Sequence, residues 1–511
     1  MQKEVDVFII GGGINGTAIA SDAAGRGLSV VLCEKNDLGS ATSSASSKLI
    51  HGGLRYLESY EFGLVRESLR EREILMRRAP YLIKPLEFVL PYENHLRPAW
   101  LIRLGLLCYD CLALRKTLPH SKSIQLRVDV RGNGLWSHLT KGFSYFDCFT
   151  DDARLVILNA LSAKEHGATI LTHTEFLEAK RNAGRWQVLL KNHFQNEILT
   201  YSAKALINVA GPWVKSVGKR ITQGPPFDIE LVKGSHIVVP RLYEGDFAYI
   251  LQNNDQRVVF AIPFHKAFTL IGTTDILWQV PSDQIIISPG EEAYLCDLIN
   301  HYFKKTIRPS DIVWSYAGVR CLRASLAENP AKMTRDYQFI LDQNEAPQLT
   351  VIGGKLTTHR LLAEGALNQL RPFFKNMGPA WTANRPLPGG DISEQNINQF
   401  KIQLANQFPW APANLIEQYT DRYGTRAYLL LKNTNTLLGL GDTFGHGLFQ
   451  KEVEYLIQEE WASSIEDILW RRTKLGLVFS AVEQQTLEDW LKKNIMIGEC
   501  SLKCVNPFYR A

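Results

Sequence analysis

Apolar and polar positions near the start of the chain switch between the period of a strand and that of a helix. Residues 5–10 form a short apolar run, glycines follow, and small and apolar residues then recur at helical spacing over 14–26. Gly27 ends that helix, and the run 28–32 predicts a second buried strand. Strand, glycine turn, helix and strand in this order predict a βαβ unit.

The same two periods return further along the chain. Residues 152–167 predict a helix and residues 203–209 another buried strand. Four β-rich runs then recur about every ten residues, at 235–240, 247–251, 257–262 and 268–272. That spacing predicts an antiparallel sheet inserted between pieces of the α/β part.

Two stretches differ from this alternation. Residues 80–131 have an irregular, basic, proline-containing character. Beyond the proline- and glycine-rich stretch 386–390 the pattern is helical to the end, with a helix start at Ser464-x-x-Asp467. We take 386–390 as the predicted domain boundary.

Composition narrows the class of protein. The 511 residues are 45% apolar and 21% charged, which excludes disorder of the whole chain, and the net charge of +5 is too small to imply nucleic-acid binding. No run of 18 apolar residues predicts a transmembrane helix, and the first residues do not resemble a signal peptide. Eight cysteines in this context predict free thiols in a reducing compartment. We expect a large intracellular protein, either soluble or bound to a membrane surface.

The first glycine turn carries the clearest chemical signal. Gly11, Gly13 and Gly16 fit G-x-G-x-x-G between a strand and a helix, and Glu34 ends the next strand. Such a turn brings a pyrophosphate to a helix N-terminus, and the acid accepts hydrogen bonds from a ribose diol. The motif predicts a dinucleotide site but does not separate NAD from FAD.

Three further segments favour a flavin. A hydroxyl-rich run at 41–48 follows the Glu34 strand, and residues 207–213 form a strand that ends in small residues. Residues 351–360 combine a strand, a glycine pair and a helix start, whose N-terminus would stabilise negative charge on a reduced flavin. Each segment alone is ambiguous, but their order along the chain is not.

With these motifs the sequence resembles the FAD-dependent, membrane-associated glycerol-3-phosphate dehydrogenases of aerobic metabolism. The resemblance covers nearly the whole chain. Its motifs are the residues 11–16, 42–56, 233–236, 272–275, 318–320, 353–358 and 469–474. One departure is Cys321, which follows Arg320 where the family commonly has proline.

The resemblance implies an α/β fold in two parts. Residues 1–385 are expected to form a glutathione-reductase-like, Rossmann-type FAD domain with an inserted antiparallel substrate sheet, and residues 386–511 a helical cap. The expected FAD-binding part is about 1–80, 150–225 and 315–385, and the substrate part about 81–149 and 226–314. The implied activity is oxidation of sn-glycerol 3-phosphate to dihydroxyacetone phosphate by hydride transfer to FAD, with electrons passed to a membrane quinone.

The same motifs provide the expected FAD contacts. They are Gly11, Gly13, Asn15, Gly16, Glu34, Thr42, Ser43, Ser46, Ser47, Lys48, Ala210, Gly211, Gly354, Lys355, Leu356, Thr357 and Thr358. We find no motif for a covalent flavin linkage, so the expected FAD is bound non-covalently.

Oxidation of a phosphorylated secondary alcohol needs a proton acceptor and cationic donors. His236 is the candidate base, although a histidine satisfied by strand packing remains an alternative. Arg55 and Arg320, both in glycine-flanked contexts, are candidates for the substrate phosphate or the developing oxyanion, against the alternative of surface ion pairs. Further substrate contacts are expected from Tyr56, His236, Thr274 and Arg335.

Cysteine spacing does not predict a metal site. Cys108 and Cys111 form a C-x-x-C, and Cys500 and Cys504 a C-x₃-C, hundreds of residues apart. Zinc sites use two such pairs at finger-like spacing. We therefore expect no metal.

Residues 97–131 are basic and rich in leucine. Seven lysines and arginines stand against two aspartates, among aromatic and leucine residues that include Trp100. This composition favours the surface of an anionic bilayer, while a core-packed helix with a solvated basic face is the alternative. With the resemblance, it predicts a cytoplasmic protein bound peripherally to the cytoplasmic membrane.

Several alternatives stay open. The protein could be a flavin oxidase that uses oxygen, acting on the same substrate or on an amino acid or 2-hydroxy acid. It could also be a flavin redox sensor without turnover. Monomer and homodimer are both compatible with the sequence.

Overall fold

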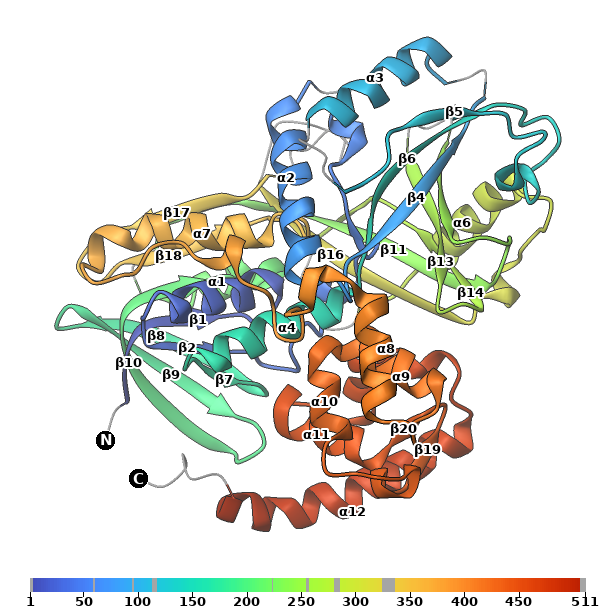
Figure 1. Ribbon diagram of the computed structural model, residues 1–511. Helices are drawn as coiled ribbons and strands as arrows, with labels where there is room; N and C mark the ends of the chain where they lie inside the picture. The colour runs from blue at the N-terminus through green and yellow to red at the C-terminus, as the bar shows by residue number, and fades with distance from the viewer. Residues whose placement is uncertain are drawn as a thin grey trace. The chain divides into compact units, whose positions relative to one another are not determined.

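The chain forms two compact units, Met1–Pro386 and Leu387–Ala511. The computed structural model (Figure 1) describes residues 3–57, 60–93, 96–112, 117–222, 224–253, 257–279, 285–323 and 336–505. Within these residues no helix is both long and apolar enough to cross a bilayer.

The first sheet of the N-terminal unit is the predicted Rossmann-type sheet. Its strand order is β17 (Gln338–Asp342), β18 (Gln348–Ile352), β10 (Glu197–Asn208), β1 (Lys3–Ile10), β2 (Val30–Cys33) and β7 (Thr169–Leu171). The strands from β18 to β7 run parallel, and β17 is antiparallel to β18. β8 (Thr174–Asn182) and β9 (Arg185–Asn192) extend it through β10.

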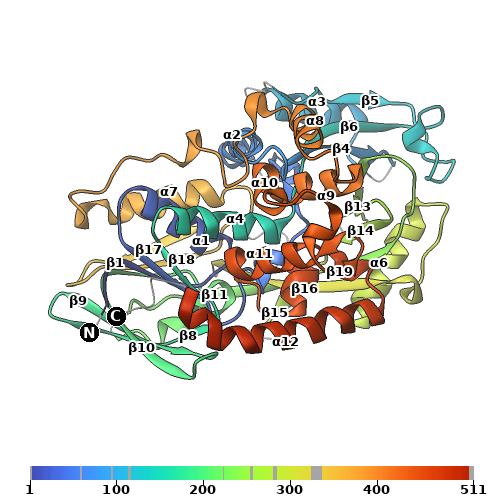
Figure 2. The same cartoon turned by 60° about the horizontal axis from the view of Figure 1, so that its bottom comes forward.

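Three helices cover this sheet. α1 (Ile14–Gly25) packs against both α4 (Asp152–Glu165) and α7 (His359–Leu370), as Figures 1 and 2 show. Nearly every residue of α1 is buried, which its small side chains at 18, 20, 23 and 24 permit at close approach. The predicted βαβ unit is therefore confirmed as β1, α1 and β2.

A second, larger sheet carries the β-rich runs. Its order is β15 (Ile276–Trp278), β11 (Ile229–Pro240), β14 (Phe268–Gly272), β13 (Val258–Phe264), β12 (Phe247–Gln252), β4 (Lys84–Pro91), β6 (Gly142–Phe149) and β3 (Leu49–Ile50). β16 (Trp314–Arg323) pairs with β11, and β5 (Lys122–Ile124) with β6. All pairings are antiparallel except that of β4 with β12.

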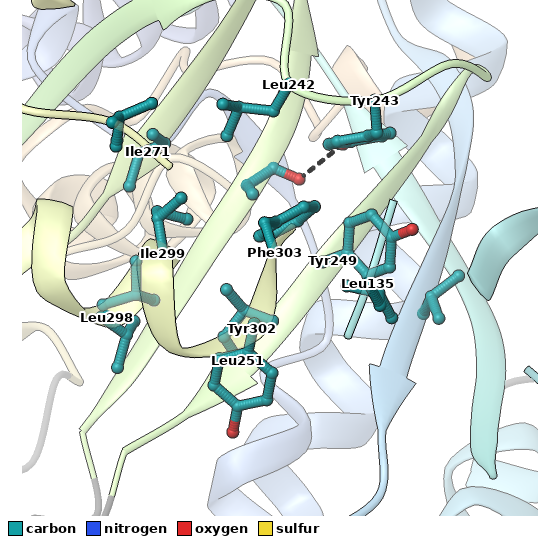
Figure 3. Close-up of a cluster of buried hydrophobic side chains, with 14 of the residues drawn as sticks. Leu135, Leu242, Tyr243, Tyr249, Leu251, Ile271, Leu298, Ile299, Tyr302 and Phe303 are labelled. Carbon is teal, nitrogen blue, oxygen red and sulfur yellow. Dashed lines mark hydrogen bonds between the residues drawn. The ribbon is translucent and has the colours of Figure 1, made fainter. Parts of the chain in front are cut away.

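An aromatic core closes one face of this second sheet (Figure 3). α6 (Pro289–Tyr302) covers it, followed by Phe303, whose ring centroid lies 5.6 Å from that of Tyr243 and 5.0 Å from that of Tyr249. The Tyr243 hydroxyl donates to the carbonyls of Phe247 (2.8 Å) and Ala261 (2.9 Å). The buried hydroxyl is thereby satisfied, as burial of a polar group requires.

The structure differs from the expected limits in two respects. The stretch 80–131 is not irregular, because β4 lies inside the second sheet and Ala99–Leu112 form α3, which follows α2 (Phe62–Arg78). Of the prolines in this stretch, Pro85 and Pro91 lie at the two ends of β4. β3 and β16, which fall within the ranges expected for the FAD-binding part, pair into the second sheet. Sheet membership depends on the partner strand, which the order of motifs does not reveal.

The C-terminal unit is helical, with one short hairpin. Its elements are α8 (Ile397–Gln407), α9 (Ala413–Tyr423), α10 (Ala427–Leu431), β19 (Thr443–Gly445), β20 (Leu448–Phe449), α11 (Gln450–Glu460) and α12 (Ala481–Val505). The expected helix start is present, since Asp467 accepts hydrogen bonds from the backbone amides of Ser463 and Ser464.

Candidate active site

The turn between β1 and α1 is packed too closely for any side chain. Gly11 has φ +119, and a Cβ there would lie 2.7 Å from the carbonyl oxygen of Val209. A Cβ on Gly16 would lie 1.9 Å from the carbonyl oxygen of Gly11. The glycines therefore serve the backbone contacts that the G-x-G-x-x-G pattern predicts.

Glu34 is oriented toward this turn. Its carboxylate accepts hydrogen bonds from the backbone amides of Gly12 (2.8 Å) and Asn36 (3.0 Å). Burial raises the pKa of Glu34 despite these two bonds. A carboxylate has further lone pairs, so the fixed oxygens remain able to accept from a ribose diol.

A cavity of about 180 Å³ lies beside the turn. Seven of the expected FAD contacts line it, namely Gly11, Gly13, Glu34, Thr42, Ser43, Ala210 and Gly211. Lys35 and Trp213 also line it, with the Lys35 ammonium 5.0 Å from the centre of the indole ring. Glycine backbone, an acid for the ribose and a helix N-terminus form a donor set that fits the dinucleotide part of FAD.

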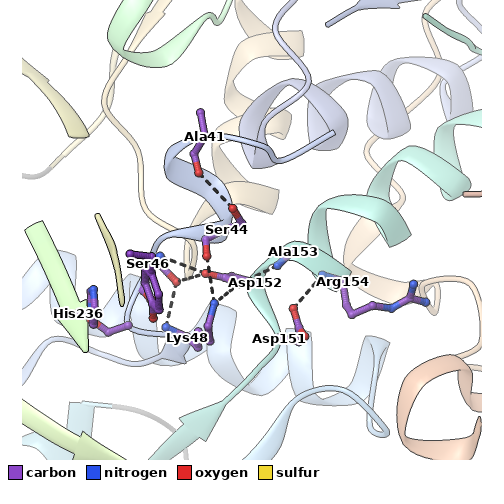
Figure 4. A network of polar contacts seen from close by, with 11 residues as sticks. Ala41, Ser44, Ser46, Lys48, Asp151, Asp152, Ala153, Arg154 and His236 are labelled. Atoms are coloured by element: carbon purple, nitrogen blue, oxygen red, sulfur yellow. Dashed lines mark hydrogen bonds and ion pairs between the residues drawn. The ribbon is translucent and has the colours of Figure 1, made fainter. Parts of the chain in front are cut away.

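The hydroxyl-rich loop is fastened to the start of α4 (Figure 4). The Asp152 carboxylate accepts from the Ser46 amide (3.1 Å), the Ser46 hydroxyl (2.7 Å) and the Lys48 ammonium (2.6 Å). The Lys48 side chain is fully buried and also donates to the Ser44 carbonyl oxygen. Lys48, expected as an FAD contact, therefore uses its charge within the protein and holds the loop.

The loop is also fastened to β16. The Thr42 hydroxyl donates to the carbonyl oxygen of Val319 (2.6 Å), and the Tyr316 hydroxyl donates to that of Ser46 (2.8 Å). The Ser43 hydroxyl accepts from the amide of Ile14 (2.9 Å), the first residue of α1. The loop thus joins the two sheets where the cavity lies.

His236 lies on β11 behind this loop. Its ring stacks on Tyr316, with centroids 4.9 Å apart, and packs so closely on Gly272 that a Cβ there would lie 2.1 Å from its Cδ2. Its Nε2 is 2.9 Å from the Ser47 hydroxyl, while Nδ1 is buried without a hydrogen-bond partner among the described residues. Burial, then the positive charges of Arg320 and Lys48, hold the pKa of His236 well below its usual value. The imidazole is therefore neutral at pH 7.

Arg320 lies on β16, beside the Gly234 backbone, where a Cβ would be 2.4 Å from its Nη2. Its guanidinium pairs with Asp275 and donates to the Thr273 hydroxyl (3.3 Å), and a quarter of its side chain is exposed. A guanidinium that is charged, oriented and partly exposed is suited to bind a phosphate.

Thr274 differs from its expected role as a substrate contact. It is buried, and its hydroxyl donates to Glu291 (2.7 Å) and accepts from the Ser235 amide (3.0 Å). Burial alone would raise the pKa of Glu291, but hydrogen bonds from Lys233, Ser235 and Thr274, among others, lower it to about 2. Thr274 belongs to this internal network.

The second glycine loop approaches the first. Asn15 donates to the carbonyl oxygen of Gly353 (3.0 Å), and a Cβ on Gly354 would lie 2.7 Å from the Asn15 amide nitrogen. Cys321, which stands where the resembled family commonly has proline, contacts the same Gly353 backbone. Burial raises the pKa of its thiol to about 12.

Lys355 in this loop carries a charge directed at Tyr56. Its ammonium is 4.1 Å from the centre of the Tyr56 ring, and it is buried without a hydrogen-bond partner in the described part of the chain. Such a group is suited to an anionic ligand. The three residues that follow have partners within the protein or are buried. The Thr357 hydroxyl accepts a hydrogen bond from the His51 amide (3.1 Å), and the Leu356 carbonyl oxygen accepts one from the His359 ring. Thr358 is buried.

Two expected arginines are not placed. Arg55 belongs to the short helix Leu54–Leu57, but its side chain is outside the described residues. Arg335 lies wholly outside them.

Cys108 and Cys111 lie on α3 as free thiols, and the described residues contain no group of three or more metal-ligating side chains.

Sequence reasoning gave no role to three residues that the structure brings to the site. Asp152 holds the serine loop, Tyr316 supports His236, and Asp275 pairs with Arg320. Asp275 stands in a motif that the resemblance uses, and Asp152 starts a predicted helix. Their partners are distant in sequence, so local patterns did not reveal these roles.

Comparisons with known proteins agree with this geometry. Residues 6–360 match the family model of the FAD dependent oxidoreductases, and residues 380–492 match the C-terminal domain of alpha-glycerophosphate oxidase. The chain is 51% identical to a glycerol-3-phosphate dehydrogenase of Pseudomonas aeruginosa, over 96% of both chains. It is 46% identical to the aerobic glycerol-3-phosphate dehydrogenase of Escherichia coli and to the D-erythritol 1-phosphate dehydrogenase of Brucella abortus, over 95% of this chain and 97% of each relative.

Solved structures show the same fold. The glycerol-3-phosphate dehydrogenase of Bacillus halodurans, solved with FAD, aligns with a TM-score of 0.74 at 23% identity and covers 100% of this chain and 97% of its own. The chain therefore belongs to the FAD-dependent oxidoreductase family. It is a flavin enzyme, and the expected family, fold class and FAD cofactor are confirmed.

Proposed function

We propose that the protein oxidises sn-glycerol 3-phosphate to dihydroxyacetone phosphate and passes the electrons to a membrane quinone. The observations that carry the substrate are two cations with a fixed orientation, Arg320 on β16 and Lys355 in the second glycine loop. The names of the relatives at 46–51% identity support the same substrate. Because one such relative is named for D-erythritol 1-phosphate, the phosphate is the better supported part of the substrate and the polyol chain the less supported.

In this proposal the site residues divide the work between them. Arg320 and Lys355 bind the phosphate, with Arg55, Tyr56 and Arg335 as further contacts. His236, neutral in its buried position, takes up the hydroxyl proton. FAD, when bound, accepts the hydride and with it both electrons. The first sheet and the loops around it hold FAD, and the second sheet orients the substrate.

The exposed surface of α3 supports a membrane quinone as the electron acceptor. Trp100, Leu104 and Leu107 are 68%, 54% and 44% exposed and recur at helical spacing, so they form one apolar face. Tyr109, on another side of the helix, is buried and bonded to Asp147. An exposed apolar face on an anchored helix fits the headgroup region of a bilayer, where a lipid-soluble quinone is available.

Part of the basic segment does not serve this surface. Arg131 pairs with Glu87 and Asp129, and Arg103 donates to the Ser121 hydroxyl (2.7 Å). Arg115 and Lys116 lie outside the described residues. We therefore assign the hold on a cytoplasmic membrane mainly to the α3 face, with Arg97, Lys122 and Arg127, which are exposed, as its cationic partners.

An oxidase that uses oxygen is the second candidate, because the family match at the C-terminal part is named for an oxidase. Anaerobic mixing with a substrate panel tests both. Glycerol 3-phosphate should bleach the flavin, whereas glycerol, amino acids and 2-hydroxy acids should not. Reoxidation by a quinone analogue should be faster than by oxygen. Bleaching by none of the phosphorylated polyols would contradict the proposed activity.

Membrane contact is tested separately. The triple variant of Trp100, Leu104 and Leu107 to Gln should lose flotation with anionic liposomes and quinone reduction in membranes, while soluble dyes are still reduced. A matched control changes two exposed leucines of the other unit, Leu437 and Leu438, to Gln. Equal flotation of both variants would remove α3 as the docking surface.

A further inference from the structure

His236 is enclosed on the sides that the structure describes. Only 2% of the residue is exposed, Tyr316 covers one face of the ring, and Gly272 touches its edge. Nδ1 is buried, and Nε2 meets the Ser47 hydroxyl at 2.9 Å. A substrate hydroxyl therefore reaches neither ring nitrogen directly. Ser47, in contrast, is half-buried.

We propose that Ser47 is a catalytic residue that relays the substrate proton to His236. This inference rests on the proposed oxidation of a phosphorylated alcohol. The O–H bond of the substrate breaks as its proton passes to the Ser47 Oγ, while the Ser47 hydroxyl proton passes to His236 Nε2. The electron pair of the broken bond forms the carbonyl, and the hydride of the adjacent carbon leaves with its own pair to the flavin.

The position of Ser47 is fixed by its neighbours in the chain. Ser46 and Lys48, on either side, both donate hydrogen bonds to the Asp152 carboxylate (Figure 4). The Ser46 carbonyl oxygen also accepts a hydrogen bond from the Tyr316 hydroxyl. The same Tyr316 ring supports His236. Donor and acceptor of the inner proton transfer are thus oriented by one framework, as proton transfer requires.

The charges around His236 set the conditions for the relay. Arg320 and Lys48 are the cations that act on it, and Tyr316, whose pKa is raised well above its usual value by burial, stays a neutral phenol. Burial and, after it, the two cations keep the imidazole neutral and so able to accept a proton. A phosphate dianion on Arg320 would offset that cationic field, so the imidazolium becomes less costly when substrate is bound.

The test compares two serines of one loop in the holoenzyme. Ser47→Ala removes the relay, whereas Ser44→Ala removes a hydroxyl that bonds only locally, to the Ala41 carbonyl oxygen, and does not line the cavity. We expect Ser47→Ala to lower kcat about 100-fold or more with little change in KM, in the range of general acid–base catalysis. Ser47→Thr should restore most of the rate, and Ser44→Ala should match the wild type.

A double variant separates a relay from two independent effects. Ser47→Ala and His236→Gln should each cost about as much as the two together, because residues that act as a unit are not additive. Multiplied losses in the double variant, or full activity in Ser47→Ala, would overturn the relay.

A readout without turnover keeps the test independent of the substrate. NMR of histidine-labelled protein shows the His236 ring signals, which are assigned by their loss in His236→Gln. These signals should change in Ser47→Ala but not in Ser44→Ala. The FAD content of the wild type and of both serine variants should be equal. Unchanged His236 signals in Ser47→Ala would contradict the contact on which the relay depends. If the contact is present but no phosphorylated alcohol bleaches the wild-type flavin, the proposed function fails instead.

Discussion

The dinucleotide cavity and the surroundings of His236 prepare for charged ligands by different means. The cavity uses backbone: glycines that let a ligand approach, a helix N-terminus and one carboxylate held by two amides. The second region uses charged side chains drawn from separate strands and loops, namely Arg320 near His236 and Lys355 near Tyr56. The glycine turn of the first site has no room for a Cβ at Gly11 or Gly16, while the second site depends on the balance among neighbouring charges.

The largest effect is expected where backbone is in contact with backbone. Gly16→Val would place atoms 1.9 Å or less from the Gly11 carbonyl oxygen, and no flexible side chain is available to yield. We expect loss of bound FAD and of all activity, measured by the flavin absorbance of purified protein. Gly63→Val, on α2 with nothing within 4 Å of its Cβ, is the control and should keep FAD. Full flavin occupancy in Gly16→Val would show that close backbone contact at this turn is not needed to bind FAD.

A smaller effect on substrate binding is expected from changing a charged side chain near His236. Arg320→Ala removes charge-assisted hydrogen bonds worth about 1.5–3 kcal/mol, so the KM for glycerol 3-phosphate should rise about 10- to 100-fold. FAD content should be unchanged, and the activity with glycerol, which has no phosphate, should fall much less. Arg241→Ala, at an arginine of similar exposure that bonds to backbone carbonyls, is the control. An equal loss for both substrates would show that Arg320 does not bind phosphate.

The charge balance itself is open to a direct measurement. The ring signals of His236 should stay those of neutral imidazole as the pH falls from 8 through 6.5, because burial and the cations Arg320 and Lys48 lower its pKa. Tyr316 faces the same ring and stays uncharged over this range. A titration centred at or above pH 6.5 would mean that His236 is not enclosed as described.

The smallest effect concerns stability. Burial, with the charges of Arg78 and Arg360, lowers the pKa of His359 to about 3 although it bonds to the Leu356 carbonyl oxygen. Between pH 6.5 and 3 the unfolded chain therefore binds more protons than the folded one, and the free energy of unfolding should fall by about 1.4 kcal/mol per unit of decreasing pH from this residue alone.

His359→Gln should weaken that dependence, measured as the urea midpoint between pH 7 and 5.5. The exposed His120, changed to Gln, serves as the control and should leave the slope as in the wild type. If the slope is the same in both variants, the buried histidine is not its source.

Sequence reasoning was most successful where one continuous segment carries the whole feature. The unit of β1, α1 and β2, the β-rich runs of the second sheet and the helical C-terminal unit all follow from local periodicity. The glycines at 11 and 16 were singled out by their spacing, and the structure leaves no room for a Cβ at either, since the strand, turn and helix that need them are adjacent in the chain.

Features made by pairing were beyond such reasoning. β16 joins β11 rather than the first sheet, and β4 lies inside a sheet although its prolines suggested irregularity. Lys48 and Thr274 were expected to face ligands, yet Asp152 and Glu291, more than 100 and 17 positions away respectively, take up their polar atoms.

The sequence by itself determined the fold class, the dinucleotide turn and the residue types at the site, because these depend on neighbours within a few positions. Only the tertiary structure decided which of those residues remain available to a ligand. A charged side chain bonds to whichever partner the fold brings within about 3 Å, and burial then sets its protonation. That is why His236 is enclosed behind Ser47, and why Lys355 rather than Lys48 is left with a charge to offer.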